Sequence, residues 1–185
     1  MARSDKQRWN ERFVNFPMPS HPSKIVIDNL KHVQGKKVLD IACGTGRNSH
    51  YLLELGFDID AVDLSDYALN ALHGNSRLTK IEADLDTYAI QKERYDLMLN
   101  INFLGRHLFE GMIHGLKQDG VLIFETFIIA HGEAYTQPSN PDYLLRHNEL
   151  LEAFKTLETL FYEERDDTNL RGEKVKIASY VGRKL

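Results

Sequence analysis

Two stretches decide the fold: Val38–Asn48, which reads VLDIACGTGRN, and Phe57–Leu64, which reads FDIDAVDL. The apolar start of the first stretch is typical of a strand that is covered on both faces. Gly44 and Gly46 then predict a sharp turn, because glycine adopts backbone angles closed to other residues and lets a ligand approach the main chain. Residues 47–55 have helical spacing, and the second stretch predicts another strand. The order is therefore strand, glycine turn, helix, strand.

An acidic residue, Asp63, ends the second predicted strand about 20 residues beyond the glycines, where an acid accepts hydrogen bonds from ribose hydroxyls. The free N–H groups at the start of the helix favour an anion. We therefore predict a nucleoside site built on Gly44, Gly46 and Asp63. Two simpler alternatives stay open: the glycines form a tight turn without a ligand, and Asp63 and Asp84 cap the helices that follow them.

Two residues near the glycine turn indicate which nucleoside binds. Ser49 occupies the place where the dinucleotide fingerprint has a third small residue, glycine or alanine. Asp40 lies in the turn region, where a carboxylate suits an ammonium or sulfonium group better than a pyrophosphate. The sequence thus favours a ligand that is cationic near Asp40.

At this point the run Val38–Gly46 resembles the first motif of the class I S-adenosylmethionine-dependent methyltransferases. Trp9–Phe13 and Gly44–Ser49 are similar, more narrowly, to the small tellurite-resistance and thiopurine type of methyltransferases. Four further segments carry the resemblance over nearly the whole chain: Asp63-Leu64-Ser65, Ala83-Asp84-Leu85, Tyr95–Asn100 and Gly120–Phe124.

The resemblance implies S-adenosylmethionine as cofactor, S-adenosylhomocysteine as product, and no metal. It also implies which residues contact the cofactor, with an acid at the ribose and an acid and apolar pair at the adenine. These residues are Asp40, Ala42, Gly44, Gly46, Asp63, Leu64, Asp84, Leu85 and Asn100.

Strands and helices keep alternating along the chain, which predicts an α/β fold with a doubly wound, mainly parallel sheet. Residues 157–165 and 174–182 read as two strands joined by a turn too short for a crossover helix, so they should form an antiparallel pair. The resemblance implies a seven-stranded Rossmann-like sheet that ends in such a pair. We expect helices over 25–33, 47–55, 67–72 and 107–116.

The length of 185 residues predicts one domain, 1–185, with an N-terminal cap and helix over 1–35 and a substrate-side insertion over 128–147. A single cysteine excludes an internal disulfide framework, and the first residues contain no apolar signal segment, so we expect a cytoplasmic protein. No run is long enough for a membrane span. The net charge of -4 disfavours a nucleic-acid partner. The oligomeric state stays open.

The insertion and the end of the fourth strand each carry an Arg-His pair, Arg106-His107 and Arg146-His147. Since the carboxyl ends of the strands meet at one edge, Arg106, Arg146 and Tyr135 are expected to bind an anionic acceptor. Arg106 and His107 are the catalytic candidates, His107 as a base if the acceptor carries a proton. The alternative is structural: Arg106 pairs with an acid and His107 caps its helix.

The function predicted is methyl transfer to a small-molecule acceptor, an oxyanion or a thiol-like or selenium-like nucleophile, by in-line displacement. Residues 100–103 read NINF and lack the paired prolines found in methyltransferases that act on amines of nucleic-acid bases, which disfavours base modification. Three alternatives remain: a dinucleotide-dependent oxidoreductase, a non-catalytic S-adenosylmethionine-binding module, and a methyltransferase acting on protein or RNA.

Overall fold

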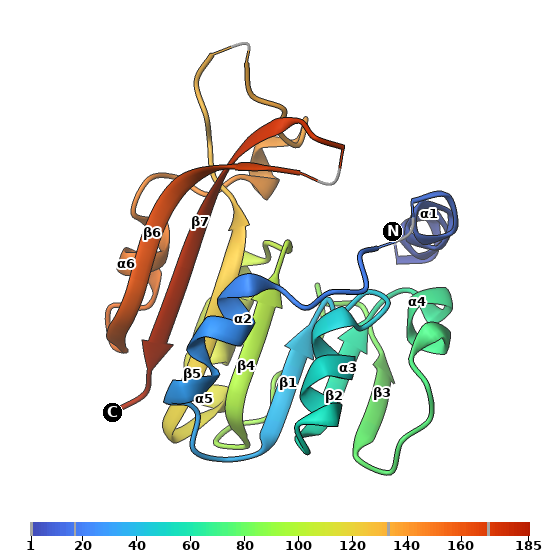
Figure 1. Cartoon of the computed structure of the whole chain (residues 1–185), viewed down its shortest axis with the longest axis vertical. Helices are drawn as coiled ribbons and strands as arrows, with labels where there is room; N and C mark the ends of the chain where they lie inside the picture. Colours follow the sequence, from blue (N-terminus) through green and yellow to red (C-terminus); the bar gives the residue numbers. More distant parts are fainter. Residues whose placement is uncertain (1, 17, 133, 170) are drawn as a thin grey trace.

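The computed structural model describes residues 2–16, 18–132, 134–169 and 171–185. Seven strands form one sheet in the order β3-β2-β1-β4-β5-β7-β6 (Figure 1). Neighbours from β3 to β5 pair in parallel, whereas β7 pairs antiparallel with β5 and β6, as predicted. The bounds are β1 Lys37–Ile41, β2 Asp58–Asp63, β3 Leu78–Glu82, β4 Tyr95–Ile101, β5 Leu116–Phe127, β6 Glu158–Thr168 and β7 Lys174–Arg183.

Helices cover both faces of this sheet (Figure 1), which confirms the doubly wound fold. Alternate strand residues point to opposite faces: Leu97 and Leu99 of β4 pack in the core beneath α2, α3 and α4, and Met98 packs in the core beneath α5 and α6. The helices are α1 Ala2–Asn15, α2 Lys24–Asn29, α3 Arg47–Glu54, α4 Asp66–Ala71, α5 Phe109–Gly115 and α6 Glu149–Ala153, with short 3₁₀ turns at Leu30–His32, Arg106–Leu108 and Pro141–Tyr143.

The helix expected over 107–116 differs from the observed structure at both ends. It begins as the 3₁₀ turn Arg106–Leu108 and continues as α5, but Leu116 belongs to β5. Leu116 pairs with Tyr95 of β4 and is fully buried, so pairing across the sheet overrides its local helical spacing. The insertion over 128–147 is largely irregular, and its ends are joined by a bridge between Ile128 and Leu145.

Residues 1 and 17 of the predicted N-terminal cap and residue 133 of the predicted insertion lie outside the described residues. Among the described residues, no helix is long and apolar enough to cross a membrane.

The order in which strands are added to the sheet reverses between β1 and β4. The strands β2 and β3 lie on one side of β1, whereas β4 and β5 lie on the other side. In open sheets of this kind, ligands bind beyond the carboxyl ends of the strands at such a switch point. The glycine turn, the end of β2 and the end of β4 all lie there.

Candidate functional site

The glycine turn after β1 holds three residues in the left-handed region, Ala42 at φ 53°, Gly44 at φ 55° and Gly46 at φ 81°. A Cβ atom on Gly46 would overlap the side chain of Leu72, and one on Gly44 would lie 3.2 Å from the ring of Phe13. The first glycine therefore lies against α1, and the second is required for close packing beside α4. Ala42 adopts its angle without being glycine, which costs about 1–2 kcal/mol and marks a strained turn of the kind found at binding sites.

The carboxylate of Asp63 closes this turn. Its Oδ2 accepts a hydrogen bond from the Gly44 N–H at 2.8 Å, and its Oδ1 accepts one from the Ser65 N–H at 2.8 Å. The residue is only 7% exposed, and burial raises the pKa of its carboxyl, while the two amides act in the opposite direction. Helix α4 is capped by Ser65, whose Oγ accepts from the Ala68 N–H, so Asp63 is not the cap.

Asp40 lies behind the same turn at the end of β1 and is 2% exposed. Ser49 of α3 donates its hydroxyl to Asp40 Oδ2 at 2.7 Å. Burial raises the pKa of Asp40 to about 6, since the charged form loses its hydration. A buried carboxylate thus lies beside the turn. Its hydrogen-bond partner is Ser49, the residue that replaces the third small residue of the dinucleotide fingerprint.

We expect Asp40→Asn to raise the free energy of unfolding at pH 7.5 by about 2 kcal/mol, because an amide removes the cost of ionising a buried acid. The pKa of Asp40 is higher in the folded chain than its ordinary 3.8, so the native state holds a proton between pH 4 and 6. Wild-type stability therefore falls as the pH rises through this window. Urea unfolding from pH 4 to 8 measures the free energy of unfolding of both proteins. The difference between Asp40→Asn and the wild type should become smaller toward pH 4.

Asp58→Asn is the matched control, since Asp58 is an exposed acid at the start of β2. It is expected to leave stability unchanged across the same pH range. A gain from Asp40→Asn that does not vary with pH would contradict the assignment of this titration to Asp40.

The predicted adenine side is formed by the loop after β3. Asp84 Oδ1 accepts a hydrogen bond from the Asp86 N–H at 3.0 Å, and the Leu85 side chain is buried. His107 Nε2 lies 2.9 Å from the Leu85 carbonyl oxygen. Since a carbonyl can only accept, Nε2 carries the hydrogen and Nδ1 is left as the basic atom. The structure thus brings His107 together with the Asp84-Leu85 segment.

Asn100 ends β4 beside this region and is fully buried. Its Nδ2 donates to the Phe103 carbonyl at 2.7 Å, while its Oδ1 has no hydrogen-bond partner among the described residues. Asn102 follows at φ 61°. Within the same described ranges, no group of three or more His, Cys, Asp or Glu side chains is placed to hold a metal.

The two arginines predicted to bind substrate converge on one carboxylate, that of Glu149. Arg106 Nε donates to Glu149 Oε1 at 2.5 Å and Arg106 Nη2 to Oε2 at 3.0 Å, and the same guanidinium also binds the carbonyls of Asp142 and Leu144. The backbone N–H of Arg146 donates to Glu149 Oε2 at 2.8 Å. These contacts favour the structural alternative for Arg106, and its role in substrate binding and catalysis stays a prediction.

The remaining candidates have partners other than Glu149. His147 Nδ1 lies 2.6 Å from Glu164 Oε2, and Tyr135 donates its hydroxyl to Asp166 Oδ1 at 2.8 Å. Lys174 lies 4.4 Å from the centre of the Tyr135 ring. Tyr135 and His147 are thus anchored on the β6–β7 hairpin, whereas His107 is anchored on the loop after β3.

Sequence reasoning missed two parts of the site. One is the set of contacts made by helix α1, which belongs to the predicted N-terminal cap: Phe13 is buried against Gly44, and the side-chain amide of Asn10 contacts Ser65 and Asp66. The signal was present in the Trp9–Phe13 resemblance, although no contact could be derived from it.

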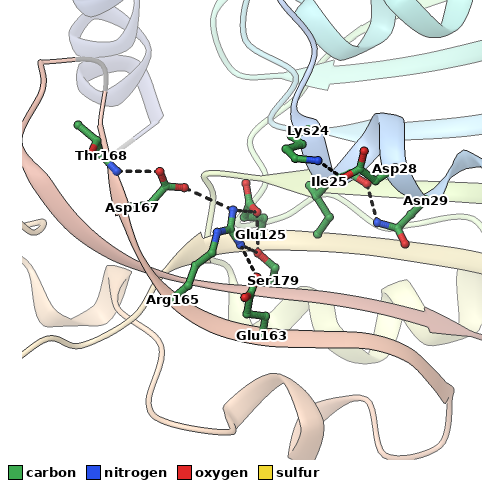
Figure 2. A network of polar contacts seen from close by, with 10 residues as sticks. All are labelled: Lys24, Ile25, Asp28, Asn29, Glu125, Glu163, Arg165, Asp167, Thr168 and Ser179. Carbon is green, nitrogen blue, oxygen red and sulfur yellow. Dashed lines mark hydrogen bonds and ion pairs between the residues drawn. The ribbon is translucent and has the colours of Figure 1, made fainter.

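The other is a polar network at the end of β5 (Figure 2). Glu125 Oε2 accepts from the Ser179 hydroxyl at 2.6 Å and pairs with Arg165 at 3.2 Å. Arg165 also pairs with Glu163 and Asp167. The partners lie 40 and 54 residues from Glu125 in sequence, so no local pattern indicated them.

Several solved structures with this fold are named as methyltransferases. TehB from Haemophilus influenzae superimposes with a TM-score of 0.75 at 24% identity, over 96% of this chain and 67% of that one. An N-methyltransferase from Haemonchus contortus, solved with phosphomonomethylethanolamine and S-adenosylhomocysteine, gives 0.69 at 15% identity, over 98% and 57%. The fold is therefore the Rossmann-like methyltransferase fold.

A family model described as "Tellurite resistance protein TehB" matches residues 7–179, and the chain belongs to this family. The resemblance to class I methyltransferases, and within them to the tellurite-resistance type, is thereby confirmed. A curated relative from Haemophilus influenzae, named a probable S-adenosyl-L-methionine-dependent methyltransferase, is 28% identical over 174 residues, and a glycine/sarcosine N-methyltransferase from Aphanothece halophytica is 32% identical over 135. The matches cover 86% and 64% of this chain, and 61% and 51% of those relatives' length.

Proposed function

We propose that this chain binds S-adenosylmethionine and transfers its methyl group to a small-molecule acceptor. One observation carries the proposal: the strained glycine turn after β1 is tied to the acid at the end of β2 by the hydrogen bond from Gly44 to Asp63. The family and the relatives named as S-adenosyl-L-methionine-dependent methyltransferases support it.

The residues present fit this cofactor. Each oxygen of Asp63 accepts one amide hydrogen bond, which leaves lone pairs for the ribose hydroxyls. The buried carboxylate of Asp40 suits the cationic end of the ligand. Asn100 Oδ1, buried and without a partner, lies at the end of β4 where the methyl group would depart. Leu64, Asp84 and Leu85 would border the adenine.

When bound, the cofactor supplies a methyl group on an electrophilic sulfonium, which an in-line attack by the acceptor displaces. The contribution of this chain is then alignment and the exclusion of water. Helix α1 supports the second task, because Phe13 covers the turn. His107 Nδ1 would take a proton from an acceptor that carries one, and the hydrogen bond to Leu85 orients the ring for it.

For the acceptor we propose a small oxyanion or a thiol-like or selenium-like nucleophile rather than a nucleic acid or a membrane lipid. The acidic net charge and the NINF sequence that ends β4 support this choice. A glycine/sarcosine N-methyltransferase and a ubiquinone biosynthesis O-methyltransferase are both among the relatives, so the comparisons do not decide which small molecule is the acceptor. We further propose a cytoplasmic location.

A second candidate is a module that binds the cofactor without transferring the methyl group. The fold alone is compatible with this candidate, because a protein named as the [4+2]-cyclase SpnF superimposes over 100% of this chain with a TM-score of 0.75 at 12% identity. The same scaffold therefore serves a different reaction in that protein.

Calorimetric titration of the purified chain with S-adenosylmethionine, S-adenosylhomocysteine and NAD tests the proposal. We expect saturable one-site binding of the first two and none of NAD. Methyl incorporation into the small-molecule fraction of a cell extract would then separate the enzyme from the binding module. A folded sample that binds neither adenosyl ligand, or that binds NAD with a 1:1 stoichiometry, would contradict the proposal.

A further inference from the structure

Two histidine rings from different elements lie against each other, that of His50 in α3 and that of His73 just after α4. The ring centres are 5.7 Å apart, and the ring planes are tilted by 45°. His50 is partly buried and His73 is exposed. Neither ring makes a hydrogen bond or an ion pair within the part of the chain that the structure describes. The basic nitrogen of each ring is therefore available to a ligand from outside the chain.

A cavity of about 180 Å³ lies beside the two rings. His50 and Glu54 line it from α3, and His73, Gly74 and Asn75 line it from the loop after α4. Residues 50 and 54 are one helical turn apart, so their side chains share one face of α3. Since a water molecule takes about 30 Å³ of liquid volume, the cavity has room for an ion together with several waters.

The separation of the two rings matches that of two ligands of one metal ion. A zinc ion lies about 2 Å from each imidazole nitrogen that binds it, which places the centres of two such rings roughly 4.5–6.5 Å apart. The observed 5.7 Å falls within this range. The torsion that turns a histidine ring has a broad preference, so both rings can direct one nitrogen toward a shared ion.

The charged groups around His50 favour its neutral ring, which is the form that binds a metal. Burial lowers the pKa of His50, and the nearby charges of His73 and Lys80 lower it further. Glu54 acts in the opposite direction and supplies negative charge at the cavity. The cavity therefore offers a neutral imidazole and a carboxylate to a cation.

We propose that His50 and His73 together bind a divalent transition-metal ion that prefers imidazole, such as Zn²⁺, with water completing its coordination. Imidazole suits zinc, copper and nickel, whereas magnesium prefers oxygen ligands. A site with two protein ligands agrees with the absence of a larger metal-ligating cluster among the described residues. Neither histidine is among the residues proposed to contact the cofactor, so this inference does not depend on the proposed function.

A bound ion would join two elements that pack beside the glycine turn. His73 directly follows Leu72, whose side chain occupies the space that a Cβ on Gly46 would need. Leu52 of α3 and Leu72 belong to the same buried cluster. An ion that binds only the folded chain raises its stability, and the gain grows with the concentration of the ion. Zn²⁺ is therefore expected to raise the Tm of the wild type.

The test is a calorimetric titration with ZnCl₂ of the chain prepared without a polyhistidine tag. We expect saturable 1:1 binding by the wild type. His50→Ala and His73→Ala should each weaken it at least about 10-fold, since the loss of even an outer partner of a metal ligand costs that much. Thermal unfolding gives a second measurement: Zn²⁺ should raise the Tm of the wild type and of neither variant, and MgCl₂ should raise none.

His114→Ala is the matched control. His114 is an exposed histidine of α5 that also lies one helical turn from a glutamate, with its Nδ1 3.9 Å from Glu110 Oε1, but within the described residues no second histidine ring lies against it. It should bind Zn²⁺ as the wild type does. A wild type without saturable binding, an equal loss in His114→Ala, or a loss in only one of the His50 and His73 variants would each overturn the inference. Because His73 is exposed, its replacement leaves the fold intact and keeps the test decisive.

Discussion

Asp63→Ala is expected to weaken the binding of S-adenosylmethionine at least about 100-fold, because hydrogen bonds to a charged group contribute strongly to affinity. The change removes the acceptor for the ribose hydroxyls. It also releases the Gly44 and Ser65 amides, which the carboxylate holds at 2.8 Å each, so the glycine turn loses its tie to β2. Titration calorimetry with S-adenosylmethionine and S-adenosylhomocysteine measures the loss.

Two further variants separate ligand contact from turn geometry. Asp63→Asn keeps one acceptor oxygen, so it should retain more affinity than Asp63→Ala. Asp58→Ala removes an exposed acid from the other end of β2 and should bind as the wild type does. Unchanged affinity in a folded Asp63→Ala variant would remove this residue from the cofactor site.

Arg106→Ala is expected to lower the free energy of unfolding by about 3 kcal/mol, since it leaves a buried carboxylate without its main partner. Glu149 is 4% exposed, and its two oxygens receive Arg106 Nε and Nη2. The Arg106 side chain is itself 39% exposed, which places the loss at the lower end of the usual range. The carbonyls of Asp142 and Leu144 would lose a donor as well. Chemical unfolding measures the change.

Arg146→Ala provides the matched control. Its side chain contacts the same Glu149 at 3.3 Å but is 74% exposed, so its removal should cost less than about 1 kcal/mol. The pair of variants also tests the earlier prediction that both arginines bind the acceptor. If Arg106→Ala keeps the stability of the wild type while the KM for the acceptor rises, Arg106 binds the substrate and its contacts with Glu149 do not stabilise the fold.

The parallel sheet, its antiparallel end and the glycine turn could all be predicted from the sequence, because each leaves a local pattern. Apolar runs covered on both faces give the strands, and Gly56, at φ 79°, ends α3 as a left-handed stop would. The turn from β1 into α3 has its glycines, Gly44 and Gly46, within a few residues of the acid Asp40. Local sequence patterns therefore specify the sheet and this turn.

The acceptor side could not be predicted in the same way. Arg106 and Glu149 are 43 residues apart, and residue type alone does not tell an arginine that binds substrate from one that holds a loop. Asp60 shows the same limit: it reads as a polar residue of β2, yet it is buried and pairs with Lys37, Arg94 and Tyr95. Such pairs depend on which segments the fold brings together.

The contact between Gly46 and Leu72 affects how inactive variants of this turn should be interpreted. Any side chain at position 46 would meet Leu72 in a backbone conformation that disfavours it, so the damage begins in the packing of α4 on the turn. Loss of activity in a Gly46 variant therefore reports disturbed packing, and it gives no information about ligand recognition. Position 44 has a left-handed backbone as well, but a Cβ there would lie 3.2 Å from the Phe13 ring instead of overlapping a side chain, so a substitution at 44 disturbs the packing less than one at 46.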